Sequence, residues 1–362
     1  MKINALREDL LNAMQTVQYS ANAKGMMPIL SGVRMEAKDE KLILHSTDLE
    51  AYTITSCQGS VEKEGECVVS HKVLMDILRD SRDEKVSVEV VGNELELRGH
   101  KSEIKLFTMP AEDFPNAPVV EIPVLGELKK EIFIPAVQKV SRAASRDEKR
   151  PSLLGILVEI GEDGLNMVST DSYRLAIHRM KEGYEKREEG QFIIPASAMV
   201  NLARIAGKSG KMDMYRDDNR GQVRFDLGDS DYIIRLIEGK FPKYSQFIPE
   251  SLEKRAEVGK EEVLGALKRA SLISSTVRMK VGQQAITMAS ESKEVGEGKE
   301  DITAEYAGEE VEIAFNSRFL EDGIQCIDGE KVVLGITEPL KPGVVKEKEG
   351  EEFMYIIMPI RI

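Results

Sequence analysis

The apolar residues of the chain recur at helical spacing in three segments that begin about 120 to 130 residues apart. Within each segment they fall at the three- and four-residue intervals that place side chains on one face of a helix. The segments are residues 7–19, 131–143 and 260–272. Pro135 lies near the start of the second segment, and we expect it in the first helical turn, where a proline removes no hydrogen bond. The pattern predicts three related amphipathic helices.

A second helical pattern recurs at the same period. Each copy starts with a short run of β-forming residues and continues with apolar residues at helical spacing. The copies are residues 67–81, 192–206 and 311–327. A polar or small residue at the junction can open each helix, and the candidates are Ser70, Pro195 or Ala196, and Asn316. The chain is therefore predicted to hold two helices in each of three repeats.

Alternating apolar and polar residues follow each second helix and predict strands. Gly92 and Asn93 separate two alternating runs within residues 85–99, which is a strong signal for a β-hairpin. The same place in the other repeats is taken by residues 211–228 and 331–347. A last strand follows each hairpin, at residues 103–115, 232–244 and 353–362.

Short motifs recur around these last strands. Met109-Pro110 in the first repeat returns as Met358-Pro359 in the third, and Phe114-Pro115 returns as Phe241-Pro242 in the second. We therefore predict an α+β chain of three repeated domains, each with two helices packed on small antiparallel sheets. The predicted domains are residues 1–120, 127–247 and 253–362. The alternative at this point is a generic α+β fold in which the similarity between repeats arises by chance.

The formal charge changes its meaning when it is divided among these elements. With 50 Lys and Arg against 63 Asp and Glu in 362 residues, the net charge is −13, which by itself disfavours a nucleic-acid partner. Counted over six stretches that hold the predicted helices and the residues next to them, however, the charge is about +7, which leaves about −20 for the rest of the chain. These stretches are residues 7–24, 71–82, 136–150, 196–211, 260–272 and 316–325. A net value says nothing about distribution. The sequence thus predicts a positive surface built by helices and a negative surface elsewhere.

No group of residues has the spacing of a catalytic or metal site. The histidines lie outside any metal-binding motif. Cys57, Cys67 and Cys326 form no CxxC pair, so we expect reduced thiols in a cytosolic protein. AGKSGK at 206–211 has Leu202 where a phosphate-binding loop needs glycine, and it is predicted to be a helix end. The sequence shows neither a signal peptide nor a membrane-spanning segment, and we expect no metal, cofactor or enzymatic activity.

Longer motifs, taken together, resemble those of one known family. They are MKINALREDLLNAMQTV (1–17), MPIL (27–30), TDLEA (47–51), AEDFP (111–115), KRPSLLG (149–155), TDSYRLA (170–176), KFPKY (240–244), AFNSRFL (314–320), EPLKPGVV (338–345) and YIIMPIRI (355–362). Over essentially the whole chain, the sequence resembles the bacterial DNA polymerase III beta subunit, the replication sliding clamp. The resemblance implies a non-catalytic processivity factor, in which two chains of three DNA-clamp domains close head to tail into a ring.

In such a ring the helices line the hole and the sheets form the outside. The resemblance implies that the ring encircles double-stranded DNA without reading its sequence and slides along it, because a positive lining attracts phosphates and not bases. The lining residues to which it points are Lys24, Lys72, Arg79, Arg146, Lys149 and Arg150. Arg204 and Lys208 are added from the charge count alone.

The resemblance also implies an apolar pocket between the second and third domains. Through it the replicative DNA polymerase, the clamp loader and other proteins with a clamp-binding motif would attach by short peptides that end in aliphatic and aromatic residues. The matching positions are Leu153, Thr170, Tyr173, Arg174, Leu175, Pro242, Leu340, Pro342, Ile356, Met358, Pro359, Ile360 and Arg361. Aliphatic walls, an adaptable methionine and a few polar groups suit this task.

For the contact between the two chains of a homodimer, the resemblance points to Ile104 and Leu106 on an edge strand of the first domain. Their partners would be Leu272 and Ile273 in the third domain. Pairing across a subunit boundary covers an edge strand that would otherwise aggregate. The third domain departs from the family pattern in a short hairpin at 277–290. It also has Gly323, which we expect to interrupt the last helix at a cost of about 1 kcal/mol relative to alanine.

Two other functions fit parts of the sequence. An enzyme on a three-lobed α+β scaffold would use the basic segment at 204–211 to bind a phosphorylated substrate. A protein-interaction scaffold would use the same surfaces without DNA. The cytoplasmic homodimeric clamp, with no membrane partner, accounts for the repeat, the charge pattern and the motifs together.

Overall fold

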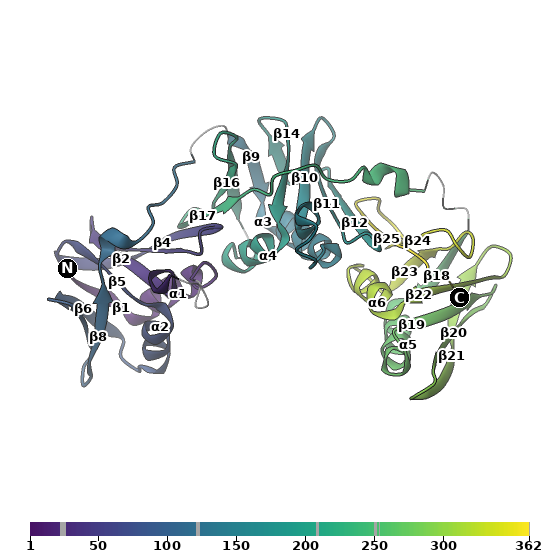
Figure 1. The fold of residues 1–362 in the computed structure, drawn as a ribbon, viewed down its shortest axis with the longest axis horizontal. Coiled ribbons are helices and arrows are strands. Elements are labelled where there is room, and N and C mark those ends of the chain that lie inside the picture. The colour runs from purple at the N-terminus through teal and green to yellow at the C-terminus, as the bar shows by residue number, and fades with distance from the viewer. Residues whose placement is uncertain (22–26, 121–123, 208–209, 250–251, 253, 362) are drawn as a thin grey trace. The chain divides into compact units, whose positions relative to one another are not determined.

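The computed structural model describes residues 1–21, 27–120, 124–207, 210–249, 252 and 254–361 (Figure 1). The chain forms two compact units, which are residues 1–130 with 201–236 and residues 131–200 with 237–362. In each unit, helices pack on antiparallel sheets. This arrangement is the α+β fold that the sequence predicts.

Six α-helices occur in the described residues, and each lies within or across a predicted segment. They are α1 (Arg7–Val17), α2 (His71–Asp80), α3 (Lys130–Val140), α4 (Ala196–Ile205), α5 (Lys260–Ile273) and α6 (Ser317–Gln325). Asn316 caps α6, because its side-chain oxygen accepts a hydrogen bond from the Phe319 amide. Ser70 precedes α2 without a side-chain cap bond. Gly207, at φ +73°, follows α4, which agrees with the predicted helix end.

The expected place of Pro135 is wrong. The helix α3 begins at Lys130, so Pro135 lies inside it and beyond the first turn. A proline there leaves one backbone carbonyl of the preceding turn without its helical donor. The helix continues to Val140 because its apolar face is fully buried, as Phe133, Val137 and Val140 show.

The first unit contains a long antiparallel sheet. Its strands are β1 (Lys2–Leu6), β2 (Gly32–Lys38), β3 (Lys41–Thr47), β4 (Ala51–Lys63), β5 (Gly65–Ser70), β6 (Lys85–Val91), β7 (Glu94–Arg98), β8 (Glu103–Met109), β9 (Val124–Lys129), β15 (Lys211–Asp217), β16 (Gln222–Asp226) and β17 (Ser230–Arg235). Their order is β1-β6-β7-β8-β5-β2-β3-β4-β17-β16-β15-β9. The predicted hairpin turn lies between β6 and β7, where Gly92 has φ +60°.

The second unit contains a sheet built in the same way. Its strands are β10 (Gly155–Gly161), β11 (Gly164–Thr170), β12 (Arg174–Met180), β14 (Gly190–Pro195), β18 (Arg255–Gly259), β19 (Thr276–Val281), β20 (Ala285–Ser292), β21 (Gly296–Tyr306), β22 (Val311–Asn316), β23 (Lys331–Gly335), β24 (Gly343–Glu347) and β25 (Phe353–Ile357). Their order is β14-β10-β11-β12-β25-β24-β23-β18-β21-β20-β19-β22. The short strand β13 (Tyr184–Lys186) lies outside this sheet.

Each repeat has its core between helices and sheet. In the first repeat, Leu10 and Met14 of α1 and Leu74 of α2 are fully buried against the strands. In the third repeat, Val263 of α5 and Ile324 of α6 are buried in the same way. The apolar helix faces that the spacing predicts are therefore the faces that pack on the sheets.

The strand pairing that joins one repeat to the next has the same register in both units. In the first unit, β17 of the second repeat pairs with β4 of the first, and Tyr232 lies opposite Thr53. In the second unit, β25 of the third repeat pairs with β12 of the second, and Tyr355 lies opposite Ala176. Thr53 and Ala176 are equivalent, because each lies six residues after the threonine of a Thr-Asp motif. The chain thus builds one kind of junction twice.

Gly323 does not interrupt the last helix, so that expectation is wrong. The helix α6 runs through it, and a Cβ atom on Gly323 would lie 2.5 Å from Cδ1 of Tyr355. The tyrosine ring is fully buried against the helix backbone, and its hydroxyl donates to the Phe319 carbonyl at 2.9 Å. Glycine is needed here for close approach and not for a break in the helix.

The change Gly323→Ala is expected to lower the free energy of unfolding by about 1–3 kcal/mol, because the new methyl group overlaps the Tyr355 ring. Gly265→Ala in α5 is the matched control. Its Cβ would meet only the flexible Arg269 guanidinium at 3.4 Å, so the better helix propensity of alanine should raise stability by up to about 1 kcal/mol. Urea denaturation measures both changes. Equal effects of the two substitutions would contradict the packing role of Gly323.

Candidate functional site

The predicted basic residues lie on exposed helix faces and loops. Lys72 and Arg79 are exposed on α2, and Arg204 is exposed on α4. Lys24 and Lys208 lie outside the described residues. The remaining three, Arg146, Lys149 and Arg150, are exposed in the loop between two 3₁₀ turns, η3 (Ser141–Ala143) and η4 (Pro151–Leu154).

The prediction that the helices themselves carry the positive charge is wrong. The six observed helices carry ten Lys and Arg against nine Asp and Glu, a surplus of one. The predicted segments were longer than the helices, since α1 ends at Val17 and α3 ends at Val140. The segment 141–150 alone has four basic and two acidic residues. The cationic surplus therefore belongs to segments that follow helices, where positive charge also complements the helix dipole.

These cations are only lightly held by other groups. Arg79 pairs with Asp76 at 3.0 Å along α2, and Arg150 donates to the Ser172 hydroxyl at 3.0 Å. Arg204 lies over the Tyr19 ring, 5.6 Å from its centroid. An exposed ion pair contributes little to stability, so such side chains can turn to a phosphate at small cost.

The predicted pocket residues of β12 and β25 meet in one apolar row. Leu175 lies opposite Ile356, and Ile356 lies opposite Val344 of β24. All three are buried in a cluster on one face of the sheet. Phe241, Tyr244, Ile248 and Leu252 of the segment after β17 pack against this cluster. Leu175 and Ile356 thus form a buried floor and not an open surface. Leu153 in η4 is also buried, but it lies outside this cluster.

The other predicted pocket residues are more accessible. Tyr173 and Leu340 are each 65% exposed, and Pro242 and Arg361 are also exposed. The partly buried members are Thr170, Arg174, Pro342, Met358, Pro359 and Ile360. The Met358 amide donates to the Tyr173 carbonyl at 2.8 Å, which fixes the C-terminal segment beside the β11–β12 turn. The structure thus brings residues of the second repeat next to residues of the third, at the pairs Tyr173–Met358 and Leu175–Ile356.

Arg174 holds this site together. Its Nε donates to Asp171 at 2.9 Å, and its Nη1 donates to Asp322 of α6 at 2.5 Å and to the Tyr355 hydroxyl at 3.3 Å. Its guanidinium also lies 4.3 Å from the centroid of the Phe319 ring. Burial opposes the charge of Arg174, but Tyr355 and the two carboxylates outweigh it and raise the pKa above its usual value. Arg174 therefore links the second and third repeats by ion pairs and is not a free cation.

A second set of ion pairs links the same two repeats. The ammonium of Lys139 on α3 lies 2.7 Å from Asp328 and 3.2 Å from Glu347, and its side chain is only 12% exposed. Next to it, Arg142 donates to Gln325 at 2.7 Å. The positive charge of Lys139 is therefore used within the protein. The sequence analysis did not find these supporting groups, because ion pairs between distant segments leave no periodic signal.

The predicted contact residues between chains lie at two accessible places. Ile104 and Leu106 are half-buried on β8. Ile104 lines a hollow of about 550 Å³ together with Val73, Ile77, Val86 and Leu97. Leu272, near the end of α5, is 76% exposed, and the neighbouring Ile273 is partly exposed. The hollow is also lined by Asp76, Asp80 and Asp83, so it has apolar walls and an acidic margin. An exposed leucine and a hollow with apolar walls are what an interface requires.

Comparisons with known proteins identify the family. The models of the DNA polymerase III beta subunit match its N-terminal domain to residues 1–118, its central domain to residues 127–243 and its C-terminal domain to residues 245–361. The chain belongs to the DNA polymerase III beta-subunit family. The family resemblance of the motifs is thereby confirmed.

Curated relatives and solved structures cover the full chain. The beta sliding clamp of Streptomyces coelicolor is 28% identical over 376 residues, and that of Pseudomonas putida is 26% identical over 369 residues; each match covers 100% of both chains. The solved sliding clamp from Pseudomonas aeruginosa is 26% identical, with a TM-score of 0.92 and 100% of both chains covered. The beta subunit from Thermotoga maritima is 25% identical, with a TM-score of 0.93, 100% of this chain and 99% of its own chain covered.

These matches confirm three clamp domains in one chain and place it among the beta sliding clamps, which are non-catalytic processivity factors. None of the helices in the described residues is long and apolar enough to cross a membrane. Burial raises the pKa of the thiols of Cys57 and Cys67 to about 12 and that of Cys326 to about 11, so all three are neutral thiols at pH 7.

Proposed function

We propose that two copies of this chain close into a ring that encircles duplex DNA in the cytoplasm, slides along it and tethers the replicative polymerase. Membership of the sliding-clamp family supports this function. The proposed domains are residues 1–120, 127–247 and 253–362. Ring closure, DNA contact and partner binding are each supported by a different part of the structure.

Ring closure is supported by a junction that one chain leaves incomplete. Strand β8 is equivalent to β17 and β25, since its Met109-Pro110 matches Met358-Pro359. Strand β21 is equivalent to β4 and β12, because each pairs with a strand that carries a buried serine near its C-terminal end. These serines are Ser290 on β20, Ser46 on β3 and Ser169 on β11. Among the described residues, β8 from 103 to 107 and β21 from 296 to 303 each have a ladder partner on one side only. A second copy would complete both.

The repeated register predicts how the two edges meet. Ser290 is the equivalent of Ser169, which pairs with Ala176, and Ser290 itself pairs with Gly298. Leu106 is the equivalent of Tyr355, the partner of Ala176. Gly298 of one copy would therefore lie opposite Leu106 of the other.

Contacts between helices support the same closure. Tyr19 just beyond α1 contacts Arg204 of α4, and Arg142 just beyond α3 contacts Gln325 of α6. Tyr19 and Arg142 each lie twelve residues after the first residue of their helix, and the residue at this position in α5 is Leu272. On α2, the equivalent of Arg204 is Arg79. Leu272 of one copy would therefore reach the hollow beside α2 of another, where Val73 and Ile77 provide apolar walls. Burial of this 76% exposed leucine favours the contact.

The exposed cations support weak, sequence-independent DNA contact. They comprise Lys72, Arg79, Arg146, Lys149, Arg150 and Arg204, with Lys24 and Lys208 proposed from the sequence. Long basic side chains on exposed helix faces and loops bind phosphate without reading base edges, and salt weakens this binding. The net charge of −13 keeps the rest of the surface from adhering to DNA.

The apolar floor of Leu175, Ile356 and Val344, rimmed by Tyr173 and Leu340, supports a pocket for partner peptides. The peptides of the polymerase, the clamp loader and other partners would place aliphatic and aromatic side chains on this floor. The Arg174 network fixes the rim before a peptide arrives, which lowers the ordering cost of binding.

The repeated junction register carries the proposal, and retention on circular DNA tests it. Light scattering at micromolar concentration should give about twice 40.4 kDa. After loading on nicked circular DNA, the protein should remain bound through a wash at high salt and should dissociate when the circle is cut. A monomer at this concentration, or equal retention on linear DNA, would contradict the ring.

A further inference from the structure

Among the large apolar side chains in the described residues, Phe107 has the largest exposed fraction, 84%. Side chains alternate along β8, so Phe107 lies on the opposite face from Ile104 and Leu106. It therefore faces away from the hollow beside α2, and neither the hollow nor the edge hydrogen bonds explain it. Val91, 51% exposed, lies two strands away on the same face, with Glu94 between them.

We propose that Phe107 is a second anchor between two copies of this chain, on the outer face of the joined sheets, and that it packs on Val295, Glu297 and Lys299 of the other copy. The inference rests on the proposed ring closure, because it uses the register of that junction. Its own content is an apolar contact on the face opposite to Leu272. This contact would hold the seam from both sides.

The register brings these residues together. With Gly298 opposite Leu106 of the other copy, Phe107 falls opposite Glu297, on the face that carries Glu297 and Lys299. Its diagonal neighbours are Val295 and Lys299, within reach of an aromatic ring. Val295 immediately precedes β21 and is 66% exposed. Phe107 and Val295, which are 84% and 66% exposed in the single chain, would cover each other.

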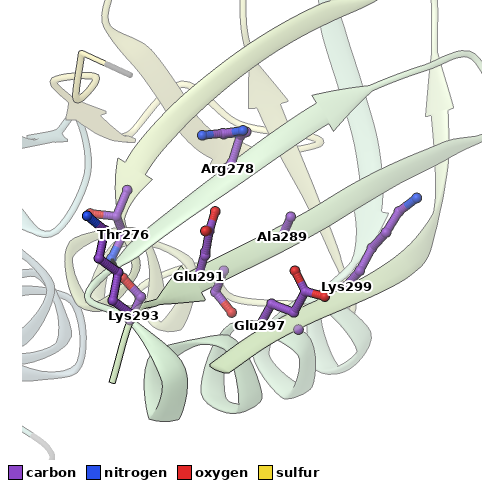
Figure 2. Close-up of a pocket in the computed structure, with 10 residues that line it drawn as sticks. Thr276, Arg278, Ala289, Glu291, Lys293, Glu297 and Lys299 are labelled. Carbon is purple, nitrogen blue, oxygen red and sulfur yellow. Dashed lines mark hydrogen bonds between the residues drawn. The ribbon is translucent and has the colours of Figure 1, made fainter. Parts of the chain in front are cut away.

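The outer face of the third repeat has room for the aromatic side chain of Phe107. A hollow of about 680 Å³ lies over β19, β20 and β21, on the side away from α5 (Figure 2). Ala289, a small residue in its lining, lies directly between Arg278 and Lys299 on the neighbouring strands. Figure 2 shows Glu297 and Lys299 at one margin of this hollow, on β21. That margin is the edge that the second copy would join.

Charges around the contact are compatible with it. In this register Lys105 lies opposite Lys299, which alone would be unfavourable. Lys105 is already paired with Glu96 of its own sheet at 2.7 Å, and its diagonal neighbours across the seam are Glu297 and Asp301. Lys299 has Glu103 on one diagonal and the Phe107 ring on the other, where a cation favours the ring face. Each lysine thus meets an acidic or aromatic group.

Sedimentation of single variants tests the anchor. Phe107→Ser should weaken each seam about 10-fold, and because both seams of a dimer must open, the dimer dissociation constant should rise about 100-fold. Val295→Ser should weaken the dimer in the same direction. Val119→Ser is the control, since Val119 is 59% exposed and lies outside both edges. Phe107 and Val119 are exposed, so neither change should alter the circular dichroism spectrum.

The variant Leu272→Asp separates this inference from the ring itself. It should give monomers, because a carboxylate buried beside Val73 and Ile77 would lose its water in a hollow that already holds Asp76, Asp80 and Asp83. If Leu272→Asp gives monomers and Phe107→Ser dimerises within twofold of the unchanged chain, the anchor is wrong and the ring stands. If the unchanged chain is a monomer, both the proposed function and the anchor are wrong. A double Phe107→Ser and Val295→Ser variant no weaker than either single one would further support direct contact.

Discussion

Replacing Arg174 by methionine should lower the free energy of unfolding by about 2–3 kcal/mol, because it removes charged hydrogen bonds from a largely buried network. Asp171 would keep only its backbone amide donors, and Asp322 would keep only Arg142, 3.5 Å away. The Arg174 side chain is 11% exposed, and those of Asp171 and Asp322 are 14% and 26% exposed. Methionine keeps the apolar volume over the Phe319 ring, so the change isolates the loss of charge. Urea denaturation followed by far-ultraviolet circular dichroism measures the effect.

The control for this change is Arg79→Met on α2. Its ion pair with Asp76 has the same sequence spacing as that of Arg174 with Asp171, but the Arg79 side chain is 52% exposed. Removing an exposed pair should cost about 0.5 kcal/mol or less. A loss below about 1 kcal/mol in Arg174→Met would show that the network does not tie the repeats together. Asp322→Asn should fall between the two, since the amide oxygen still accepts a hydrogen bond from the guanidinium.

The sequence was sufficient for the repeat, the six helices and the hairpins, because these depend on periodic side-chain patterns and on turn residues. Asn316 at the start of α6 and Gly92 between β6 and β7 act as their residue types predict. Pro135 and Gly323 were misjudged for a common reason. At both positions burial against neighbouring segments outweighs local helix propensity, and no local rule contains that contribution.

The candidate site was predictable only in part. Exposed Tyr173 and Leu340 and buried Leu175 all belong to motifs that are recognisable in sequence, but their motifs do not separate rim from floor. The carboxylates that hold Arg174 are 3 and 148 residues away from it along the chain. Asp171 can be recognised in the Thr-Asp motif, but the contact with Asp322 depends on packing between repeats. The charge prediction failed because helix ends, which periodicity locates poorly, decide whether Arg146 or Lys149 is counted on a helix.

Introducing aspartate at Leu340 should lower the affinity for a short peptide that ends in aliphatic and aromatic residues by about 100-fold. Leu340 is 65% exposed in the turn that leads into β24, whose Val344 is part of the apolar floor. A charge at the rim would have to lose its water when an apolar peptide covers it, and nothing in the bound peptide would replace that water. Fluorescence anisotropy with a labelled peptide measures the loss.

The matched control is Leu49→Asp. Leu49 is 54% exposed in the Thr-Asp turn of the first repeat, at φ +74°, a conformation that aspartate tolerates better than most residues. This turn is equivalent to the one that carries Tyr173, but Tyr52 and Ile233 stand in its junction where Leu175 and Ile356 form the pocket floor, so the apolar surface there has a different shape. Leu49→Asp should therefore bind the peptide as the unchanged chain does, and Leu340→Asp should still sediment as a dimer. If the peptide instead lost affinity for Leu49→Asp, binding would belong to the first repeat, and the apolar row on β12, β25 and β24 would be only core.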